Sequence, residues 1–381
     1  MKNSGEQKPL VRLSRSSTGE AEIAAVSEAV RRAALGMGAE VEAFEKELAQ
    51  FIGGQRQVIC VSTGTAALQL AVQACGIGRG DEVLVPTLTF VSCFQAVSAT
   101  GATPVACEVL RESGCLDPDD AARRITPHTK AIMPVHYASG AGKLDDVYAL
   151  AKKRGLRVIE DAAHAFGGVH NVARVGATGD VVCFSFDGIK NITSGEGGAV
   201  VTSDAAVANR IKDARLLGVE KDTEKRYTGQ RSWEFDVTAQ GWRYHMSNVF
   251  AALGRAQLRR LEREFAPRRA QLARQYVKLL ANVPQLRHLN LNYGEIVPHI
   301  FPVFIANGRR DAVREALRAE NIESGIHYKP NHLLSFYGGG KVRLPVAEEL
   351  YAQMLTLPLH YELADQEQKR VVEVVRGALV G

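Results

Sequence analysis

Short apolar runs alternate with segments of helical periodicity through most of the first 202 residues. The run at 58–61 is typical of a buried strand, whereas Val41, Phe44 and Leu48 recur at helical spacing. Such alternation predicts an α/β fold, in which a mostly parallel sheet is covered by helices on both faces. We expect seven strands, at 58–61, 82–85, 104–107, 131–135, 158–160, 181–186 and 198–202. We expect helices at 20–35, 39–51, 63–75, 90–99 and 147–154.

The pattern becomes less regular after this alternating part. Residues 220–245 are polar and aromatic without a clear period, which predicts a long functional loop. A helix is expected at 247–264, and Pro267 is expected to begin another that ends near Leu280. The arginines of 255–274 are expected to lie on a solvated helix face.

Beyond about residue 285, isolated strands mix with helices, which predicts a smaller α+β unit. We therefore divide the chain into a large α/β domain at 1–265 and a small C-terminal domain at 266–381. In the small domain we expect strands at 300–305 and 324–327, and helices at 311–320, 346–354 and 365–378.

The composition excludes several classes of protein. Hydrophobic residues make up 46% and charged residues 23% of the 381 residues, which is typical of a globular protein and not of a disordered or fibrous one. The net charge of +5 is too small to indicate a nucleic-acid partner, although it suits a site for anions. No stretch approaches 18 consecutive apolar residues, so we expect no membrane partner.

The beginning of the chain and its cysteines indicate a cytoplasmic protein. The first residues, MKNSGEQKPLVRLSR, lack the apolar run of a secretory signal. The six cysteines form no CxxC pair and have no histidine at zinc spacing, so we expect reduced thiols. His327 and His332 are close in sequence, but no carboxylate or cysteine set completes a metal site, and we expect no metal. The glycines at 76–80 precede a strand, which disfavours dinucleotide binding.

Ligands of α/β sheets bind beyond the carboxyl ends of the strands, so the residues that follow each strand are the first candidates for chemistry. The predicted strand at 158–160 is followed by Asp161 and then by His164. A carboxylate placed at a strand end inside a pocket requires a cationic partner. The alternative for Asp161 is a helix N-cap, a position where aspartate is favoured.

The strand at 181–186 contains Ser185 and leads to Lys190, which glycines at 195, 197 and 198 follow. Glycines allow backbone or ligand to approach closely. A lysine between two buried strands can be desolvated, which lowers its pKa as a Schiff-base lysine requires. The alternative is a solvated loop lysine.

A third candidate is the strand-to-helix turn at Thr63, Gly64, Thr65 and Ala66. The N–H groups at a helix start, together with hydroxyls, form an anion site. This turn is not a P-loop, because no Gly-Lys-Ser/Thr follows. A phosphate site, a carboxylate and a lysine at successive strand ends are the groups that pyridoxal 5'-phosphate (PLP) requires.

Long motifs carry a resemblance to a known family. In chain order they are GMGAEVEAFEKELAQFIG, VSTGTAALQLA, GDEVLVPTLTFVSC, TKAIMPVHYASG, VIEDAAHAFGG, FSFDGIKNITSGEGGAVVT and LTLPLH. Over about residues 15–375 the chain resembles the DegT/DnrJ/StrS family of PLP-dependent nucleotide-sugar aminotransferases. The PVHYASG, EDAAHAFG and KNIT segments look most similar to the subgroup that aminates C4 of nucleotide-linked 4-keto sugars.

The resemblance implies the fold-type I aminotransferase architecture and a homodimer whose active sites are shared between subunits. Matched motif by motif, Lys190 would form the Schiff base with PLP and Asp161 would face the pyridinium nitrogen. The turn from Gly64 through Thr65 to Ala66, together with Ser185, would hold the phosphate.

Other positions follow from the same match. His164 and Phe90 would pack against the cofactor ring. At 241–246 the chain reads GWRYHM where the family often has G-x-N-x-R-M, so Arg243 takes the place of an asparagine that reaches the partner subunit's phosphate. The alternative for Arg243 is a surface arginine. The candidates for substrate binding are His299, His327 and Tyr328.

The implied reaction transfers the amino group of L-glutamate to a nucleotide-linked 4-keto-6-deoxy sugar, leaving 2-oxoglutarate. The 4-amino sugar would serve surface polysaccharide, such as a lipopolysaccharide O-antigen, or a related glycan. The alternatives are amination at C3 and a PLP-dependent sugar dehydratase, whose members carry histidine in place of Lys190. A non-enzymatic regulator would need an added DNA-binding domain, for which the polar N-terminal stretch is too short.

Overall fold

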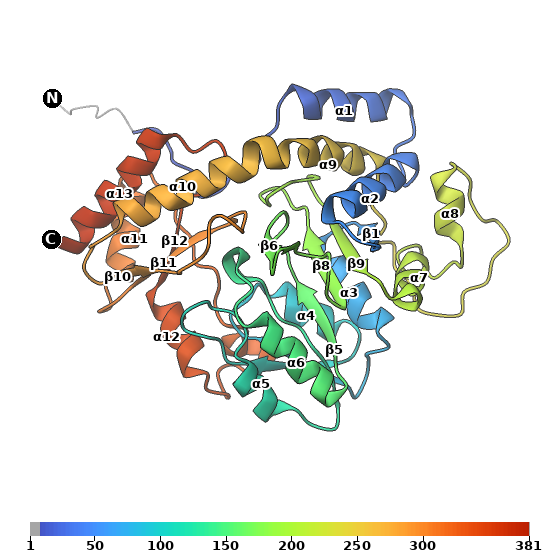
Figure 1. The fold of residues 1–381 in the computed structure, drawn as a ribbon, viewed down its shortest axis with the longest axis horizontal. Helices are drawn as coiled ribbons and strands as arrows, with labels where there is room; N and C mark the ends of the chain where they lie inside the picture. The colour runs from blue at the N-terminus through green and yellow to red at the C-terminus, as the bar shows by residue number, and fades with distance from the viewer. Residues whose placement is uncertain (1–7, 381) are drawn as a thin grey trace.

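The computed structural model describes residues 8–380. A seven-stranded sheet forms the centre of the larger part, and a three-stranded sheet forms the smaller part (Figure 1). The order of the large sheet is β1-β9-β8-β5-β4-β2-β3, and β9 alone runs antiparallel to its neighbours. This confirms the predicted α/β fold. The strands are β1 (Gln57–Val61), β2 (Glu82–Pro86), β3 (Thr103–Cys107), β4 (Thr129–Ile132), β5 (Arg157–Asp161), β8 (Val181–Ser185) and β9 (Gly198–Thr202).

Alternate residues of each strand face opposite layers of helices. In β1, Ile59 and Val61 pack toward one layer, whereas Val58 and Cys60 pack toward the other. The first layer contains α3 (Gly64–Ala74), α4 (Ser92–Ser98) and α7 (Ala205–Ala214). The second contains α2 (Ala39–Ile52), α5 (Pro118–Arg124), α6 (Leu144–Arg154) and α9 (Asn248–Arg260).

The small sheet, β10-β11-β12, is antiparallel and lies beside α10, α11 and α13 (Figure 1). Its strands are β10 (Leu286–His288), β11 (Phe301–Ile305) and β12 (Met354–Leu357). The helices of this part are α10 (Ala266–Leu279), α11 (Arg310–Ala319), α12 (Pro345–Gln353) and α13 (Asp365–Val380).

Smaller elements complete the chain. Helix α1 (Glu20–Arg31) packs along α9, and α8 (Asp222–Tyr227) projects at the edge of the molecule with the irregular segment that follows it (Figure 1). The predicted loop at 220–245 therefore contains one short helix. The two-stranded ribbon is β6 (Val169–His170) with β7 (Ala173–Arg174), and short 3₁₀ turns lie at Tyr137–Ser139, Asn331–Leu333 and Ser335–Tyr337.

Helices α9 and α10 join without a break through a π-helical turn at Leu261–Phe265. Pro267 lies in the first turn of α10, a position where proline is tolerated, but α10 continues α9 and is not a separate helix. The division proposed between residues 265 and 266 falls inside this continuous run and stays a prediction.

Two other expectations for the C-terminal part are wrong. The segment 324–327 is not a strand, because it pairs with β12 only through the bridge between Gly325 and Thr356. Arg269 is not solvated, since it is 4% exposed and its guanidinium donates hydrogen bonds to the carbonyls of Pro298, His299 and Leu359.

The N-terminal segment links the two sheets near the candidate site. Val11 forms a bridge with Ile322, and the carbonyl of Leu13 accepts a hydrogen bond from the N–H of Leu359. Ser16 Oγ then donates a hydrogen bond of 2.5 Å to the carbonyl of Gly188, two residues before Lys190. This segment therefore anchors the turn that carries the lysine.

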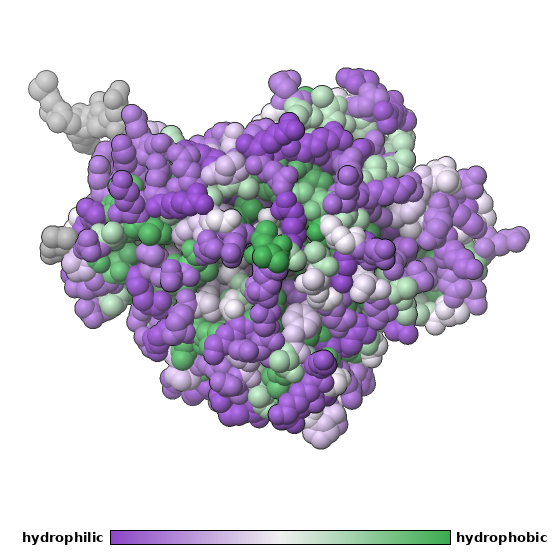
Figure 2. Space-filling view, viewed as in Figure 1, coloured by the Kyte–Doolittle hydropathy of each residue, from purple (hydrophilic) through white to green (hydrophobic). Residues whose placement is uncertain are grey.

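The face in Figure 2 is mainly hydrophilic, with apolar residues in scattered patches. Isolated exposed apolar residues are ordinary on a protein surface. Within residues 8–380, no helix has both the length and the apolar composition that a membrane span requires.

Candidate active site

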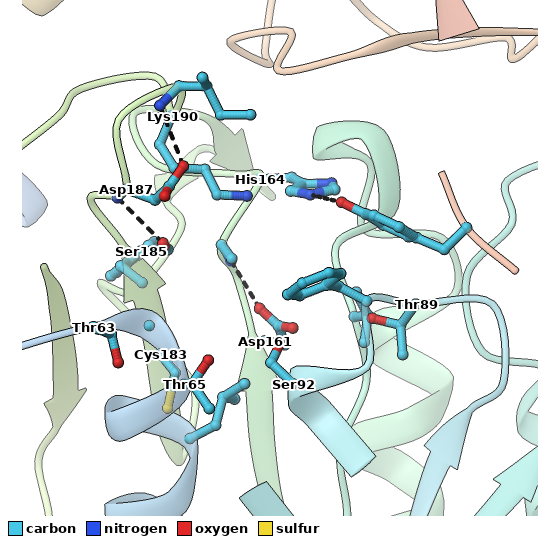
Figure 3. A pocket seen from close by; sticks show the side chains of 18 of the residues that line it. Thr63, Thr65, Thr89, Ser92, Asp161, His164, Cys183, Ser185, Asp187 and Lys190 are labelled. Carbon is cyan, nitrogen blue, oxygen red and sulfur yellow. Dashed lines mark hydrogen bonds between the residues drawn. The ribbon is translucent and has the colours of Figure 1, made fainter. Parts of the chain in front are cut away.

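The carboxyl ends of β5 and β8 open into a cavity of about 350 Å³ beside the N-terminus of α3 (Figure 3). Asp161 ends β5 and Ser185 ends β8, and both side chains line this cavity. In β8, Cys183 and Ser185 share one face because side chains alternate along a strand. That face is the one that α3 and α4 cover, which explains why these strand ends meet α3.

An anion cradle lies where α3 begins. Thr63 caps the helix by accepting a hydrogen bond from the N–H of Ala66 at 3.0 Å. The N–H groups of Gly64 and Thr65 have no partner within the helix, as in the first turn of any helix. A Cβ at Gly64 would lie 2.7 Å from Ser185 Cβ, so glycine permits the close approach of α3 to β8. Hydroxyls and free N–H groups thus converge on one end of the cavity.

Asp161 is a buried carboxylate with two hydrogen bonds. It is 5% exposed, Oδ1 accepts from the N–H of Ala163 at 3.0 Å, and Oδ2 accepts from the Cys93 thiol at 2.8 Å. Burial and the adjacent Asp161 raise the pKa of Cys93 well above its ordinary value, so the thiol stays protonated and donates. These contacts fix the carboxylate in the cavity wall. Asp161 accepts from an N–H two residues on, but it ends a strand and does not cap a helix.

Lys190 lies in the turn after β8, where its N–H donates to the carbonyl of Asp187 at 3.0 Å (Figure 3). Burial lowers its pKa, and Asp161 and Asp187 oppose that effect because negative charge favours the ammonium form. Nζ lies 3.3 Å from Nε2 of His299. The side chain therefore belongs to the cavity wall and is not a solvated loop lysine.

Three histidines surround the lysine in uncharged form. Burial and the charge of Lys190 lower the pKa of His164 and of His299 well below the usual value, and lower that of His327 to about 4. His164 Nε2 lies 3.1 Å from the Tyr328 hydroxyl (Figure 3). A neutral imidazole adds no positive charge around the amine, and one of its ring nitrogens can accept a hydrogen bond.

Phe90 forms the open rim of the cavity. Its side chain is 54% exposed, and its ring lies 5.5 Å from that of Tyr328. An exposed aromatic ring at a pocket mouth can cover a flat ligand. The expected stacking role of Phe90 is therefore compatible with its place but stays a prediction.

The structure brings together most of the predicted site residues. Ala66 does not line the cavity, and its N–H donates to the Thr63 hydroxyl. His299 does not line the cavity either, but its ring contacts the amine of Lys190. Arg243 lies on the surface outside this cavity, in a stretch whose backbone bonds to Ala214 and Arg215. The predicted residues that line the cavity are Gly64, Thr65, Phe90, Asp161, His164, Ser185, Lys190, His327 and Tyr328.

Two functional candidates, Asp187 and Cys93, were not predicted from the sequence. Asp187 lines the cavity and lies two residues after β8, which is a signal like the one that identified Asp161. Cys93 was expected only to be a reduced thiol, and no spacing in the sequence links it to Asp161 across the sheet. Among residues 8–380 no group of three or more histidine, cysteine, aspartate or glutamate side chains is placed to hold a metal ion.

Comparison with known proteins assigns the chain to a family. The sequence profile of the DegT/DnrJ/EryC1/StrS aminotransferase family matches residues 16–376. The chain belongs to this family. It is 34% identical over 373 residues to the spore coat polysaccharide biosynthesis protein SpsC of Bacillus subtilis (strain 168), and the match covers 95% of each chain.

Solved aminotransferase structures of this kind superpose closely. The aminotransferase TlmJ of Streptoalloteichus hindustanus shares 34% identity at a TM-score of 0.88, covering 97% of this chain and 99% of the other. The PLP form of Spr1654 from Streptococcus pneumoniae, described as a sugar aminotransferase, shares 25% identity at a TM-score of 0.90, covering 98% and 99%. The chain is thus an aminotransferase by family, with the fold of these structures.

The residues of the cavity fit PLP. The cradle at Gly64, Thr65 and Ser185 offers donors for a phosphate, which bears more negative charge than any other part of the cofactor. Asp161 is a buried carboxylate without a cationic partner among the described ion pairs, so a protonated ring nitrogen would supply the charge it lacks. Lys190, with its lowered pKa, lies at the same cavity.

Proposed function

We propose that this aminotransferase uses PLP to move the amino group of L-glutamate to C4 of a nucleotide-linked 4-keto-6-deoxy sugar. The observation that carries the proposal is the partly buried amine of Lys190, at a cavity whose other walls are Asp161 and the anion cradle. PLP held there would act as an electron sink, which is the chemistry it supplies to amino-group transfer. The amino sugar would enter a surface polysaccharide or a related glycan.

Each residue then has a defined task. Lys190 would hold PLP covalently, and its free amine would take the proton from the α-carbon of glutamate and deliver it to C4′ of the cofactor. Asp161, held by Cys93 and Ala163, would keep the ring nitrogen protonated. Glutamate would leave as 2-oxoglutarate before the keto sugar enters, which gives ping-pong kinetics.

The proposed sugar substrate and the proposed position of amination are inferred from similarity to other sequences. SpsC is a polysaccharide biosynthesis protein, which favours a carbohydrate pathway for this chain as well. Amination at C4 is proposed over amination at C3, because the PVHYASG, EDAAHAFG and KNIT segments resemble those of the C4-aminating subgroup. A dehydratase is disfavoured because Lys190 occupies the position where those relatives carry histidine. We also propose a cytoplasmic location, because the cysteine pattern of the sequence predicts reduced thiols.

A panel of nucleotide-linked keto sugars tests the proposal. With L-glutamate as donor, the protein is expected to aminate 4-keto-6-deoxy sugars and to leave the matching 3-keto isomers unchanged. The panel carries thymidine, uridine and guanosine diphosphates, and products are identified by mass spectrometry and their carbon position by NMR. Amination of the 3-keto isomers alone would replace C4 by C3, and formation of a deoxy sugar without nitrogen would establish the dehydratase instead.

The enzyme is further proposed to be a homodimer with shared active sites. Arg243 is exposed in one chain and lies outside the cavity of that chain. The segment before it carries exposed apolar side chains, with Trp233 83% and Phe235 58% exposed. Exposed aromatic residues are enriched where protein surfaces meet. A second copy that covers this segment would bring Arg243 to the partner's phosphate cradle.

Arg243→Ala is expected to weaken PLP binding about tenfold to a hundredfold, because a charge-assisted hydrogen bond to phosphate is worth roughly 1.5–3 kcal/mol. Fluorescence titration of the cofactor-free variant measures this. Mixing Arg243→Ala with Lys190→Ala at limiting PLP should restore activity, since one site of each heterodimer then has both residues. Arg231→Ala, a nearby exposed arginine, is the matched control. Demonstrated subunit exchange without regained activity would show that Arg243 does not serve the partner's site.

A further inference from the structure

His299 is held rigidly from its backbone. It precedes β11, its N–H donates to Ser139 Oγ at 3.1 Å, and its carbonyl accepts from Arg269 at 3.3 Å. The residue is 4% exposed. A side chain fixed in this way has little freedom to move, so the place of its imidazole ring is set by the junction of the two sheets.

The ring faces Lys190 and not the open cavity. Nε2 lies 3.3 Å from the lysine Nζ, and the ring centroid lies 4.4 Å from that of His164. His299 is absent from the residues that line the cavity, although Lys190 is among them. Within the described residues Nδ1 is buried and has no hydrogen-bond partner. The only polar side chain within hydrogen-bond distance of the ring, among those described, is thus the amine of Lys190.

The charges around the pair favour a neutral imidazole. Burial, and then the charges of Lys190 and Arg269, disfavour the protonated ring of His299. On the lysine side, burial disfavours the ammonium form.

Two acidic groups act in the opposite sense on the lysine, namely Asp161 and Asp187. The pair therefore does not carry two positive charges at neutral pH. A neutral ring next to an amine that can be protonated serves best as an acceptor, with its own proton on Nδ1.

We propose that His299 is a positioning residue for Lys190, whose free amine it holds against the cavity wall by accepting a hydrogen bond at Nε2. The assignment rests on the proposed function only in taking Lys190 as the reacting lysine. An amine released from the cofactor would return to one place beside the cavity. Because the acceptor favours the ammonium form over the neutral amine, His299 also keeps the pKa of Lys190 from falling further.

This role differs from the substrate contact that the family resemblance implied for His299. The imidazole would meet a bound sugar only after the lysine had moved aside. His327 and Tyr328 line the cavity and keep the predicted place for substrate contacts.

The test measures the pH dependence of Lys190 reactivity in the full-length chain after PLP has been removed. Limited reductive methylation at a series of pH values, with mass spectrometry of the Lys190 peptide, gives the midpoint for the free amine. His299→Phe is expected to lower that midpoint by about one to two pH units, since it removes a hydrogen bond to a charged donor. His299→Gln keeps an acceptor and should restore most of the shift.

His332→Gln is the matched control, because His332 is equally buried but bonds to Thr87 and Glu348 instead. It should leave the midpoint unchanged. An unchanged midpoint in folded His299→Phe overturns the proposal.

If His299→Phe does not fold, ¹⁵N NMR spectra of the wild-type chain test the proposal, because they report which ring nitrogen of His299 carries the proton. A neutral His299 protonated at Nδ1 supports the proposal, and an imidazolium or a proton on Nε2 at neutral pH contradicts it. Neither measurement uses a donor or a sugar, so failure of the amination panel would leave this result intact.

Discussion

Lys190→Ala is expected to abolish covalent attachment of PLP and to slow the glutamate half-reaction by about 10⁴-fold or more, because both the covalent link and the general base are lost. The wild-type protein should be yellow, and borohydride should fix PLP to the peptide that contains Lys190. The partly buried amine with its lowered pKa is the physical reason, since a neutral amine is the nucleophile. Peptide mapping after reduction and single-turnover absorbance provide the measurements.

Lys153→Ala is the control for this experiment, because Lys153 is an exposed lysine on α6. It should leave both the colour and the half-reaction unchanged. A borohydride-stable PLP on any lysine other than Lys190 would contradict the assignment, and so would a normal half-reaction rate in Lys190→Ala.

Asp161→Asn is expected to retain PLP while slowing the glutamate half-reaction roughly a thousandfold. A buried ion pair is worth several kcal/mol, and each 1.36 kcal/mol of barrier is a factor of ten in rate. Asparagine can still accept from the N–H of Ala163, but its amide group would place a donor against the Cys93 thiol where Oδ2 now accepts. The variant thus loses both the charge and the contact that orients it.

The rate is read from the cofactor absorbance after glutamate is added, and bound PLP from its release in alkali. Asp204→Asn makes the same chemical change at the N-cap of α7, where asparagine caps equally well, and should have no effect on the rate. Near-normal turnover of Asp161→Asn in the half-reaction would exclude the proposed role of the carboxylate.

The large sheet was predictable because parallel strands buried on both faces are short apolar runs, and all seven appear in the sequence. Helix α5 and strand β12 were not predicted, because neither shows a clear apolar run of its own. Helix α5 begins with the Asp117 cap and Pro118, although its remaining residues are mostly polar. Strand β12 follows α12 directly, and its run of four apolar or threonine residues is too short to separate from a helix end.

The site was predictable where its residues follow strands. Asp161 and Lys190 could be associated because parallel strands place their carboxyl ends at one edge of the sheet. The contacts made by Cys93 and His299 could not, since each joins segments far apart in the chain through packing that no periodicity records. Arg269 shows the same limit, because its helix is basic in sequence, yet its guanidinium is buried against backbone carbonyls that flank strands of the small sheet.

The π-helical turn at Leu261–Phe265 holds one residue more than a regular α-helical turn. Removing one residue from it would restore regular α-helix and leave the side chains of α10 pointing as they do now. Arg269 and Tyr276 would still face the small sheet, and the carbonyl of His299 would keep its guanidinium partner. Inserting one residue instead would rotate α10 by about 100° around its axis, because this turn already holds the extra residue. One-residue deletions should therefore be tolerated at this junction and one-residue insertions should not, since only insertions would disturb the packing behind the lysine.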